Sequence, residues 1–233
     1  MKWLRYIILV SVVGLGCFLK TPPVLAGGVE EKATASLEVL REIVRIPEKG
    51  VPAVLLSDAY GIAIIPGALK VGFVVGGKYG TGILMVHEKG GGWSDPAFIS
   101  LVSGSFGWQI GAEATDLILI FKSARSIEGI KKGKFTIGGD ASVAAGPVGR
   151  STAAATDVQL KAEIFSYSRS RGLFAGISLE GAALNIDEDA NSSFYGKKEV
   201  RADDIFSGKV STSSDSIRKL KNLLADYSKM SNK

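Results

Sequence analysis

The sequence has little of what metal centres and common catalytic sites are built from. Its 233 residues include a single cysteine, Cys17, and a single histidine, His87. One imidazole cannot supply a two-histidine zinc site, and no further cysteine is present to assist it. The H-E-x-x-H and G-x-S-x-G motifs of zinc proteases and hydrolases are also missing. We therefore predict a protein that is not an enzyme and that needs neither metal nor cofactor.

Long hydrophobic runs are missing as well, which excludes a multi-span membrane protein. The apolar run Ile7–Leu19 is too short to span a bilayer comfortably, follows a positively charged start and precedes the small residue Ala26. This layout is typical of a cleaved signal peptide. We predict that residues 1–26 are a signal peptide, that the mature chain begins near Gly27, and that it is exported to the periplasm or an envelope membrane. The alternatives are a retained N-terminal anchor and a lipoprotein attached through Cys17.

Charge of one sign is scarce once the signal peptide is removed. The whole chain has 28 Lys and Arg against 23 Asp and Glu, and three of the basic residues lie in the first 26. The mature chain therefore keeps 25 basic and 23 acidic residues, a net charge of +2. Attraction to an anionic surface must then come from a local patch. We expect no nucleic-acid partner.

Glycine is abundant, with 29 residues scattered without a period, which indicates many tight turns and favours β structure. From Tyr60 onward, short apolar runs alternate with glycine, and Pro66–Gly67 has the composition of a turn between two of them. The predicted strands are Ile62–Ile65, Val71–Gly76, Thr81–Glu88, Phe98–Gly104, Gln109–Ala112, Asp116–Phe121, Phe135–Ile137, Ala141–Ala145, Leu160–Ser168 and Leu173–Ile186.

Apolar residues at helical spacing mark both ends of the mature chain. Helices are predicted over residues 33–46, 52–58, 123–130, 203–206 and 215–230. We expect the last one to pack on the sheet, with a membrane-surface helix as the alternative. The predicted fold is α+β, a curved antiparallel β-sheet or barrel-like β core with flanking N- and C-terminal helices. We assign residues 27–233 to a single domain.

Two short motifs resemble known binding sites without meeting their requirements. Gly72–Lys78 fits G-x-x-x-x-G-K, but Tyr79 stands where a nucleotide-binding loop needs Ser or Thr, and no helix is predicted to follow. The consecutive acidic residues Asp187–Asp189 lack the ligand spacing of a calcium loop and are interpreted as a solvated turn. Asn191–Ser193 is a formal glycosylation site.

Basic residues are the stronger indication of a binding site. Three lysines crowd the glycine-flanked turn at 131–134, and strand alternation puts Tyr167, Arg169 and Arg171 on one face. Arginine matches phosphate oxygens, and tyrosine suits the boundary between water and acyl chains. The alternatives are a solvated outer face and lipid held in an apolar pocket. The predicted anionic-lipid site consists of Lys131, Lys132, Lys134, Arg150, Tyr167, Arg169 and Arg171.

Five segments carry a resemblance to a known family: Gly92–Pro96, Gly107–Asp116, Ser142–Arg150, Tyr167–Gly181 and Asn191–Gly196. Together they resemble the SYLF domain, over about residues 34–196. Several blocks in the right order are more specific than any single short motif.

The resemblance implies a lipid-binding module without catalytic residues. Eukaryotic members bind phosphoinositides, and some bind and bundle actin beside Src-homology-3 or FYVE domains. Bacterial members are typically stand-alone envelope proteins, and the chain looks like an exported bacterial member. We therefore expect it to bind anionic phospholipid or phosphoinositide-like headgroups at an envelope membrane. The alternative is a structural or protein-interaction component of the envelope with an unknown protein partner; actin binding is not expected of an exported chain.

Overall fold

The computed structural model describes residues 28–45, 50–72, 75–88, 91–106, 111–147, 161–170, 173–177 and 179–230. The predicted signal peptide lies outside these residues. The described helices are α1 (Val29–Arg45), α2 (Ala53–Ser57), α3 (Ala124–Lys131), α5 (Glu188–Tyr195), α6 (Ala202–Phe206) and α7 (Asp215–Lys229). The strands are β1 (Gly61–Gly72), β2 (Val75–Val86), β3 (Ala97–Phe106), β4 (Gly111–Phe121), β5 (Phe135–Thr136), β6 (Val143–Ala145), β7 (Ile164–Ser170), β8 (Leu173–Gly176) and β9 (Ala183–Ile186).

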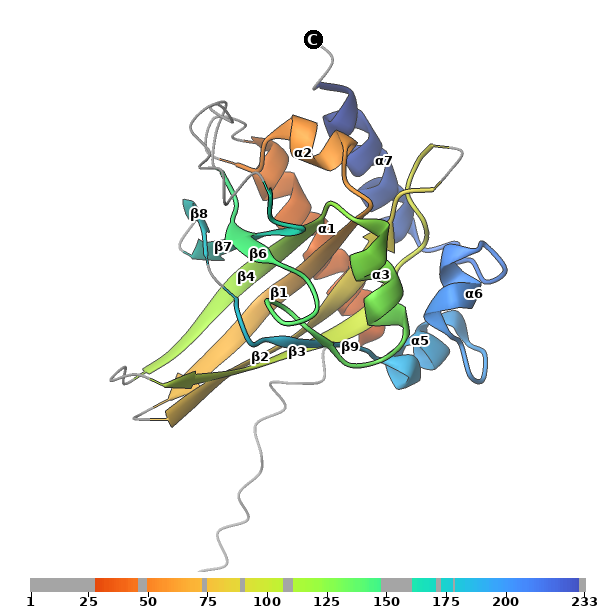
Figure 1. The fold of residues 1–233 in the computed structure, drawn as a ribbon. Coiled ribbons are helices and arrows are strands. Elements are labelled where there is room, and N and C mark those ends of the chain that lie inside the picture. The colour runs from red at the N-terminus through yellow and green to blue at the C-terminus, as the bar shows by residue number, and fades with distance from the viewer. Residues whose placement is uncertain are drawn as a thin grey trace, which may run out of the picture.

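The strands form one strongly curled sheet in the order β5-β9-β3-β2-β1-β4-β7-β6, with β8 paired to β7 (Figure 1). The predicted α+β class is confirmed. The predicted curved, antiparallel sheet with flanking helices is confirmed as well, and one edge pair departs from it, because β6 runs parallel to β7. The central pairs β1–β2, β2–β3 and β1–β4 are antiparallel. A parallel pair such as β6–β7 needs a longer crossover connection between its strands.

Helices cover both faces of the sheet, so the central strands are apolar on each side. Along β1, Ile62 and Ile64 belong to the cluster under α1, α2 and α7, whereas Ala63 and Ile65 belong to the cluster under α3. We call these the α1 face and the α3 face. Figure 1 shows α1 and α7 together on one side of the strands and α3 on the other.

The predicted turn at Pro66–Gly67 is wrong, because β1 runs through it as one strand of 12 residues. The pair opposes a single β4 residue, Asp116, and therefore forms a β-bulge. Gly67 adopts φ +57°, a conformation that glycine tolerates best. Its N–H, displaced from the regular ladder, donates to Asp116 Oδ1 at 2.9 Å. A bulge bends its strand, which accounts for part of the curl.

The predicted strand Leu173–Ile186 is also wrong, because it divides into β8 and β9. The two strands join different parts of the sheet: β8 pairs with β7, and β9 pairs with β3 and β5. Composition shows where apolar segments lie but not which strands they pair with, so one long strand could not be distinguished from two short strands.

The interpretation of Asp187–Asp189 as a solvated turn is wrong, because these residues begin helix α5. The acidic residues instead begin the helix: Asp187 is the N-cap, and its carboxylate accepts from the Ala190 N–H at 2.9 Å. Asn191 is fully buried, and its Oδ1 accepts from the Phe98 N–H at 2.7 Å. The formal glycosylation site therefore ties α5 to β3 inside the fold.

The other helices agree with the sequence to within a few residues. Helix α7 is capped by Ser214 and buries Ile217, Leu220, Leu224 and Tyr227. It packs on α1 and α2, and the last three of these side chains join the core cluster of the α1 face, so the helix packs into the fold as expected. Within the described residues, every helix is too short or too polar to cross a lipid bilayer.

Candidate functional site

The three lysines after α3 differ in their surroundings. Lys131 is largely buried, and its Nζ lies 2.7 Å from Glu128 Oε1 and 2.6 Å from Asp203 Oδ1. Burial lowers the pKa of Lys131, but the hydrogen bonds to Asp203 and Glu128 outweigh it and raise that pKa above its ordinary value. Lys132 and Lys134 are exposed and have no ion pair among the described residues. Two of the three predicted lysines are therefore available to an anionic partner.

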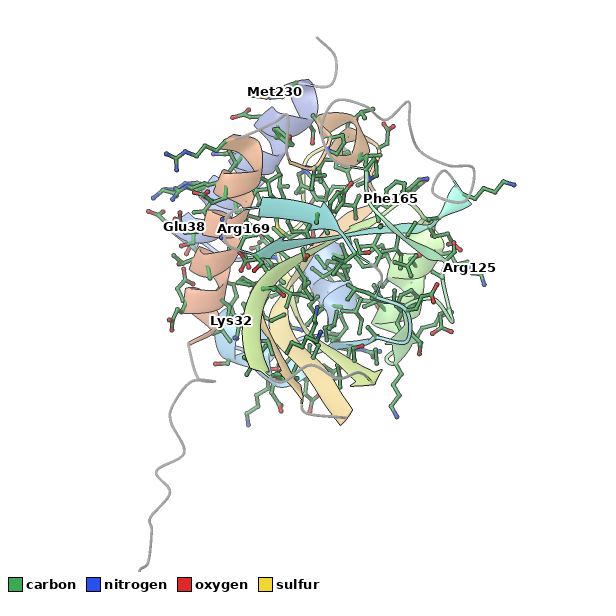
Figure 2. The ribbon with its side chains drawn as sticks, turned by 90° about the vertical axis from the view of Figure 1, so that its left-hand side faces the viewer. Lys32, Glu38, Arg125, Phe165, Arg169 and Met230 are labelled. Carbon is green, nitrogen blue, oxygen red and sulfur yellow. The ribbon has the colours of Figure 1, made fainter. Side chains whose placement is uncertain are left out.

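Arg169 is engaged within the protein. Its Nε lies 2.7 Å from Asp116 Oδ2, and its Nη1 lies 3.5 Å from Glu42 Oε2. Two carboxylates thus surround one partly buried guanidinium. Arg169 joins β7 to β4 and to α1, which Figure 2 shows beside it.

Tyr167 is fully buried in the core of the α1 face. Its hydroxyl donates to the Pro147 carbonyl at 3.1 Å, and burial, followed by the proximity of Tyr227, raises its pKa. Alternation does place Tyr167 and Arg169 on one face, but helices cover that face where Tyr167 lies. The predicted surface position of Tyr167 is therefore wrong. Arg150 and Arg171 lie outside the described residues.

The described basic residues do not gather into one patch. The 131–134 turn follows α3 and contacts α6 through Lys131, whereas Arg169 contacts α1 on the other face of the sheet. Figure 2 shows Arg169 beside α1 and Arg125 of α3 on the opposite side of the molecule. Among the described members of the predicted site, the lysines of the 131–134 turn and Arg169 therefore lie in different parts of the molecule.

An exposed apolar row that sequence reasoning missed crosses four neighbouring strands. Tyr79 of β2 pairs with Val102 of β3 and with Leu69 of β1, which in turn pairs with Ala114 of β4. Tyr79 is 43% exposed and Val102 49% exposed, and Ala114 is exposed as well. We call Leu69, Tyr79, Val102 and Ala114 the distal row. By strand alternation it lies on the α1 face, close to the β1–β2 connection. Figure 1 shows ends of these strands projecting beyond the helices at lower left.

The reverse face of the same strands carries charged positions, where Lys70 of β1 pairs with Lys78 of β2 and with Glu113 of β4. Lys70 and Lys78 pair directly across β1 and β2, each one residue from a member of the distal row. Strand alternation therefore places these lysines on the α3 face and the apolar side chains on the α1 face. This end of the sheet is amphipathic: a lysine pair lies behind an apolar surface.

The exposed lysine turn precedes an edge strand of the sheet that carries the distal row. Lys134 leads into β5, where Thr136 pairs with Ala183 of β9, and Ala183 pairs with Val102. Cross-strand partners share a face, so these residues continue the row toward the sheet edge. The lysine turn thus leads into an edge strand of the same sheet, two strands away from Val102.

The alternation that produces this surface was readable on either side of the β1–β2 connection, as Leu69-Lys70 and Lys78-Tyr79. The predicted strands stopped at Gly76 and resumed at Thr81, and this gap hid Tyr79.

Chemistry requiring a metal or nucleotide finds no support in the described residues. They contain no group of three or more His, Cys, Asp or Glu able to hold a metal ion. His87 is exposed and tilts against the Trp93 ring at 5.1 Å between centroids. Gly72 and Lys78 lie on paired antiparallel strands, and the chain continues as β2 rather than as a phosphate-binding helix.

Comparison with known proteins gives consistent matches. A family model described as "Ysc84: Las17-binding protein actin regulator" matches residues 102–227. The SH3 domain-containing YSC84-like protein 1 of Rattus norvegicus is 36% identical over 192 residues, covering 80% of this chain and 56% of the relative. The Xenopus laevis protein of the same name is 33% identical, covering 80% of this chain and 57% of the relative.

The Saccharomyces cerevisiae protein YSC84 is 40% identical over 149 residues, covering 63% of this chain and 32% of that protein. The chain thus spans about half the length of the animal relatives it matches. The residues matched by the family model begin within β3 and end within α7, and they include β4, β7 and α5. The chain belongs to the Ysc84 family, the SYLF-domain family that its sequence segments resemble.

Proposed function

We propose that this protein is a non-catalytic module that binds anionic phospholipid membranes through the distal row and the neighbouring lysine turn. The observation that carries the proposal is the amphipathic sheet end, where Tyr79 and Val102 are about half exposed side by side. Contiguous exposed apolar side chains rimmed by cations mark interaction surfaces. Tyrosine suits a membrane boundary because its ring is apolar and its hydroxyl stays hydrated.

The apolar contribution to binding is modest. Burying a whole large apolar side chain contributes about 1.5–3 kcal/mol, so half-exposed Tyr79 and Val102 contribute about 1 kcal/mol each, and Leu69, which is largely buried already, contributes less. Ala114 adds little. The row alone therefore supplies about 2–3 kcal/mol, which is too little for stable attachment.

Cations supply the remainder and the lipid preference. Lys132 and Lys134 are exposed, and each lysine near an anionic surface adds about 1 kcal/mol. The sum of about 4–5 kcal/mol corresponds to a dissociation constant on the order of 0.1–1 mM. We thus expect weak, reversible attachment that requires anionic lipid and weakens as salt rises.

Vesicle sedimentation tests the electrostatic half of the proposal. Purified protein should pellet with phosphatidylserine-containing vesicles and far less with phosphatidylcholine alone. The double change Lys132→Ala and Lys134→Ala should lower the affinity by about tenfold or more, because about 2 kcal/mol is lost. The matched double change Lys197→Ala and Lys198→Ala removes two other exposed lysines and should have a smaller effect. Equal losses of affinity in the two variants would show that the lysine turn contributes only through the net charge of the protein and is not a specific membrane contact.

A protein partner is the second candidate function. The family description and the names of relatives mention Las17 binding and actin regulation, so binding of other proteins is attributed to those relatives. In this chain, a cleft lined by α3, α6 and four carboxylates, separate from the distal row, supports this second candidate.

Export to the periplasm or an envelope membrane is part of the proposal. It rests on the N-terminal sequence alone. Intact-mass measurement of the protein recovered from its native compartment tests it: a start near Gly27 is expected. An unprocessed Met1 or a lipid-modified Cys17 would contradict it.

A further inference from the structure

We infer that a cleft between α3 and α6 binds a basic peptide segment of a partner protein. The cleft has a volume of about 1090 Å³, at the upper end of the roughly 300–1,000 Å³ typical of ligand pockets. Its other walls come from the α2–β1 connection and from the end of β2 with the turn that follows. Four separate elements thus surround a space large enough for several residues of an extended peptide.

The charge of the cleft is opposite to that of the proposed membrane surface. Four carboxylates line it, those of Asp58, Glu88, Glu128 and Asp203, and Lys131 is the one lysine or arginine that the described lining includes. Lys131 is bound by Glu128 and Asp203, so it neutralises part of their charge. Four carboxylates against one ammonium leave three negative charges unbalanced. An anionic lipid headgroup would be repelled here, and a cationic group attracted.

Two of the carboxylates are available to a partner. Asp58 and Glu88 are exposed, and neither has a lysine or arginine partner among the described residues. Asp58 accepts only a hydrogen bond from the neighbouring Ser57 hydroxyl, at 3.3 Å. Both carboxylates can therefore accept hydrogen bonds from an incoming ammonium or guanidinium group.

The spacing of the carboxylates indicates an extended partner rather than a single ion. The four residues lie on different elements, and the described part of the chain holds no cluster of three acidic or metal-binding residues that could hold a metal ion. Carboxylates distributed over the walls of the cleft are complementary to a peptide that carries several cationic side chains along its length. A peptide with repeated lysine or arginine has this property.

Aromatic rings on the same walls suit cationic side chains. Tyr60 is 52% exposed at the cleft, His87 is exposed beside it, and Phe206 is half buried on the α6 wall. Guanidinium and ammonium groups are attracted to aromatic faces, and arginine also stacks on them. The aliphatic parts of lysine and arginine side chains would also lose water and pack against these rings. Charge and ring placement therefore favour the same kind of partner.

A fluorescently labelled nona-arginine peptide is the probe for the first test. The double change Asp58→Asn and Glu88→Gln removes two cleft charges without breaking an ion pair in the described structure. The matched control is Glu31→Gln with Glu180→Gln, which removes two exposed carboxylates elsewhere. We expect the cleft variant to bind the peptide at least about fivefold more weakly and the control to change by less than about twofold. Equal losses in the two variants would overturn the cleft as the peptide site.

The second test separates the cleft from the membrane surface. Both double variants have the same net charge, so they should bind phosphatidylserine vesicles alike, whether or not the membrane proposal holds. A Tyr60→Ser variant should weaken peptide binding and leave vesicle binding unchanged. If the cleft variant differs from its control in vesicle binding instead, the cleft contacts membrane and the peptide proposal fails.

Discussion

Arg169 of β7 and Asp116 of β4 lie directly opposite each other in the sheet and form an ion pair, with 2.7 Å between Nε and Oδ2. The other carboxylate oxygen of Asp116 accepts from the Gly67 N–H at the β1 bulge. One aspartate therefore satisfies the bulge and holds the arginine, which also contacts Glu42 of α1 at 3.5 Å. These residues act in the architecture of the sheet, although a lipid-binding role was expected for Arg169.

Replacing Asp116 should destabilise the fold. In Asp116→Asn the bulge keeps an acceptor, but the partly buried guanidinium loses its main counter-charge, at a cost of about 1–3 kcal/mol of unfolding free energy. The control Asp226→Asn removes an exposed partner of Lys229 and should cost less than about 0.5 kcal/mol. Urea denaturation measures both. Similar midpoints for the two variants would contradict the architectural role.

The bulge also explains why β2 needs glycine at position 82. A Cβ there would collide with the carbonyl oxygen of Ile64 and with the backbone of Ile65, where the register between β1 and β2 shifts. Gly82→Ala should therefore cost about 3 kcal/mol, since backbone atoms cannot yield as a side chain can. A Cβ at Gly104 of β3 would meet nothing within 4 Å, so Gly104→Ala should leave stability equal or raise it by up to about 1 kcal/mol. Thermal unfolding of the pair provides the comparison.

Alkaline pH should weaken the core around Tyr167. Burial raises the pKa of Tyr167 above its ordinary value of about 10, and only the protonated hydroxyl can donate to Pro147. A raised folded-state pKa contributes stability that is fully present below the unfolded value, so it is lost as pH rises above about 10. Tyr167→Phe should lose about 1 kcal/mol at neutral pH and show a shallower alkaline decline.

Tyr60→Phe is the control for that measurement, because Tyr60 is about half exposed and its hydroxyl has no partner in the described structure. It should match the unmodified protein at neutral pH and in its alkaline decline. An identical alkaline decline in the Tyr167→Phe variant would show that Tyr167 does not govern it.

Features set by local chemistry were predictable from the sequence. The periodicity of α1 and α7 and the composition of the strands gave the α+β class and most elements. Features set by long-range pairing were not. The bulge at Pro66–Gly67 depends on Asp116, which lies 49 residues further along the chain.

The candidate site divides in the same way. Sequence alone identified Lys132 and Lys134 as exposed cations, and alternation correctly put Tyr167 and Arg169 on one face. It could not show that helices cover that face at Tyr167. Nor could it show that Tyr79 and Val102 become neighbours, because their contact depends on the β2–β3 register.

The most direct test of the membrane proposal is the affinity for phosphatidylserine-containing vesicles of the double variant Tyr79→Ser and Val102→Ser. The control, Val54→Ser with Met230→Ser, removes two similarly exposed apolar side chains from α2 and the end of α7. Loss of about 2 kcal/mol of apolar burial predicts roughly 30-fold weaker binding for the distal-row variant and nearly unchanged binding for the control. A folded distal-row variant that binds these vesicles as tightly as the unmodified protein would contradict the proposal.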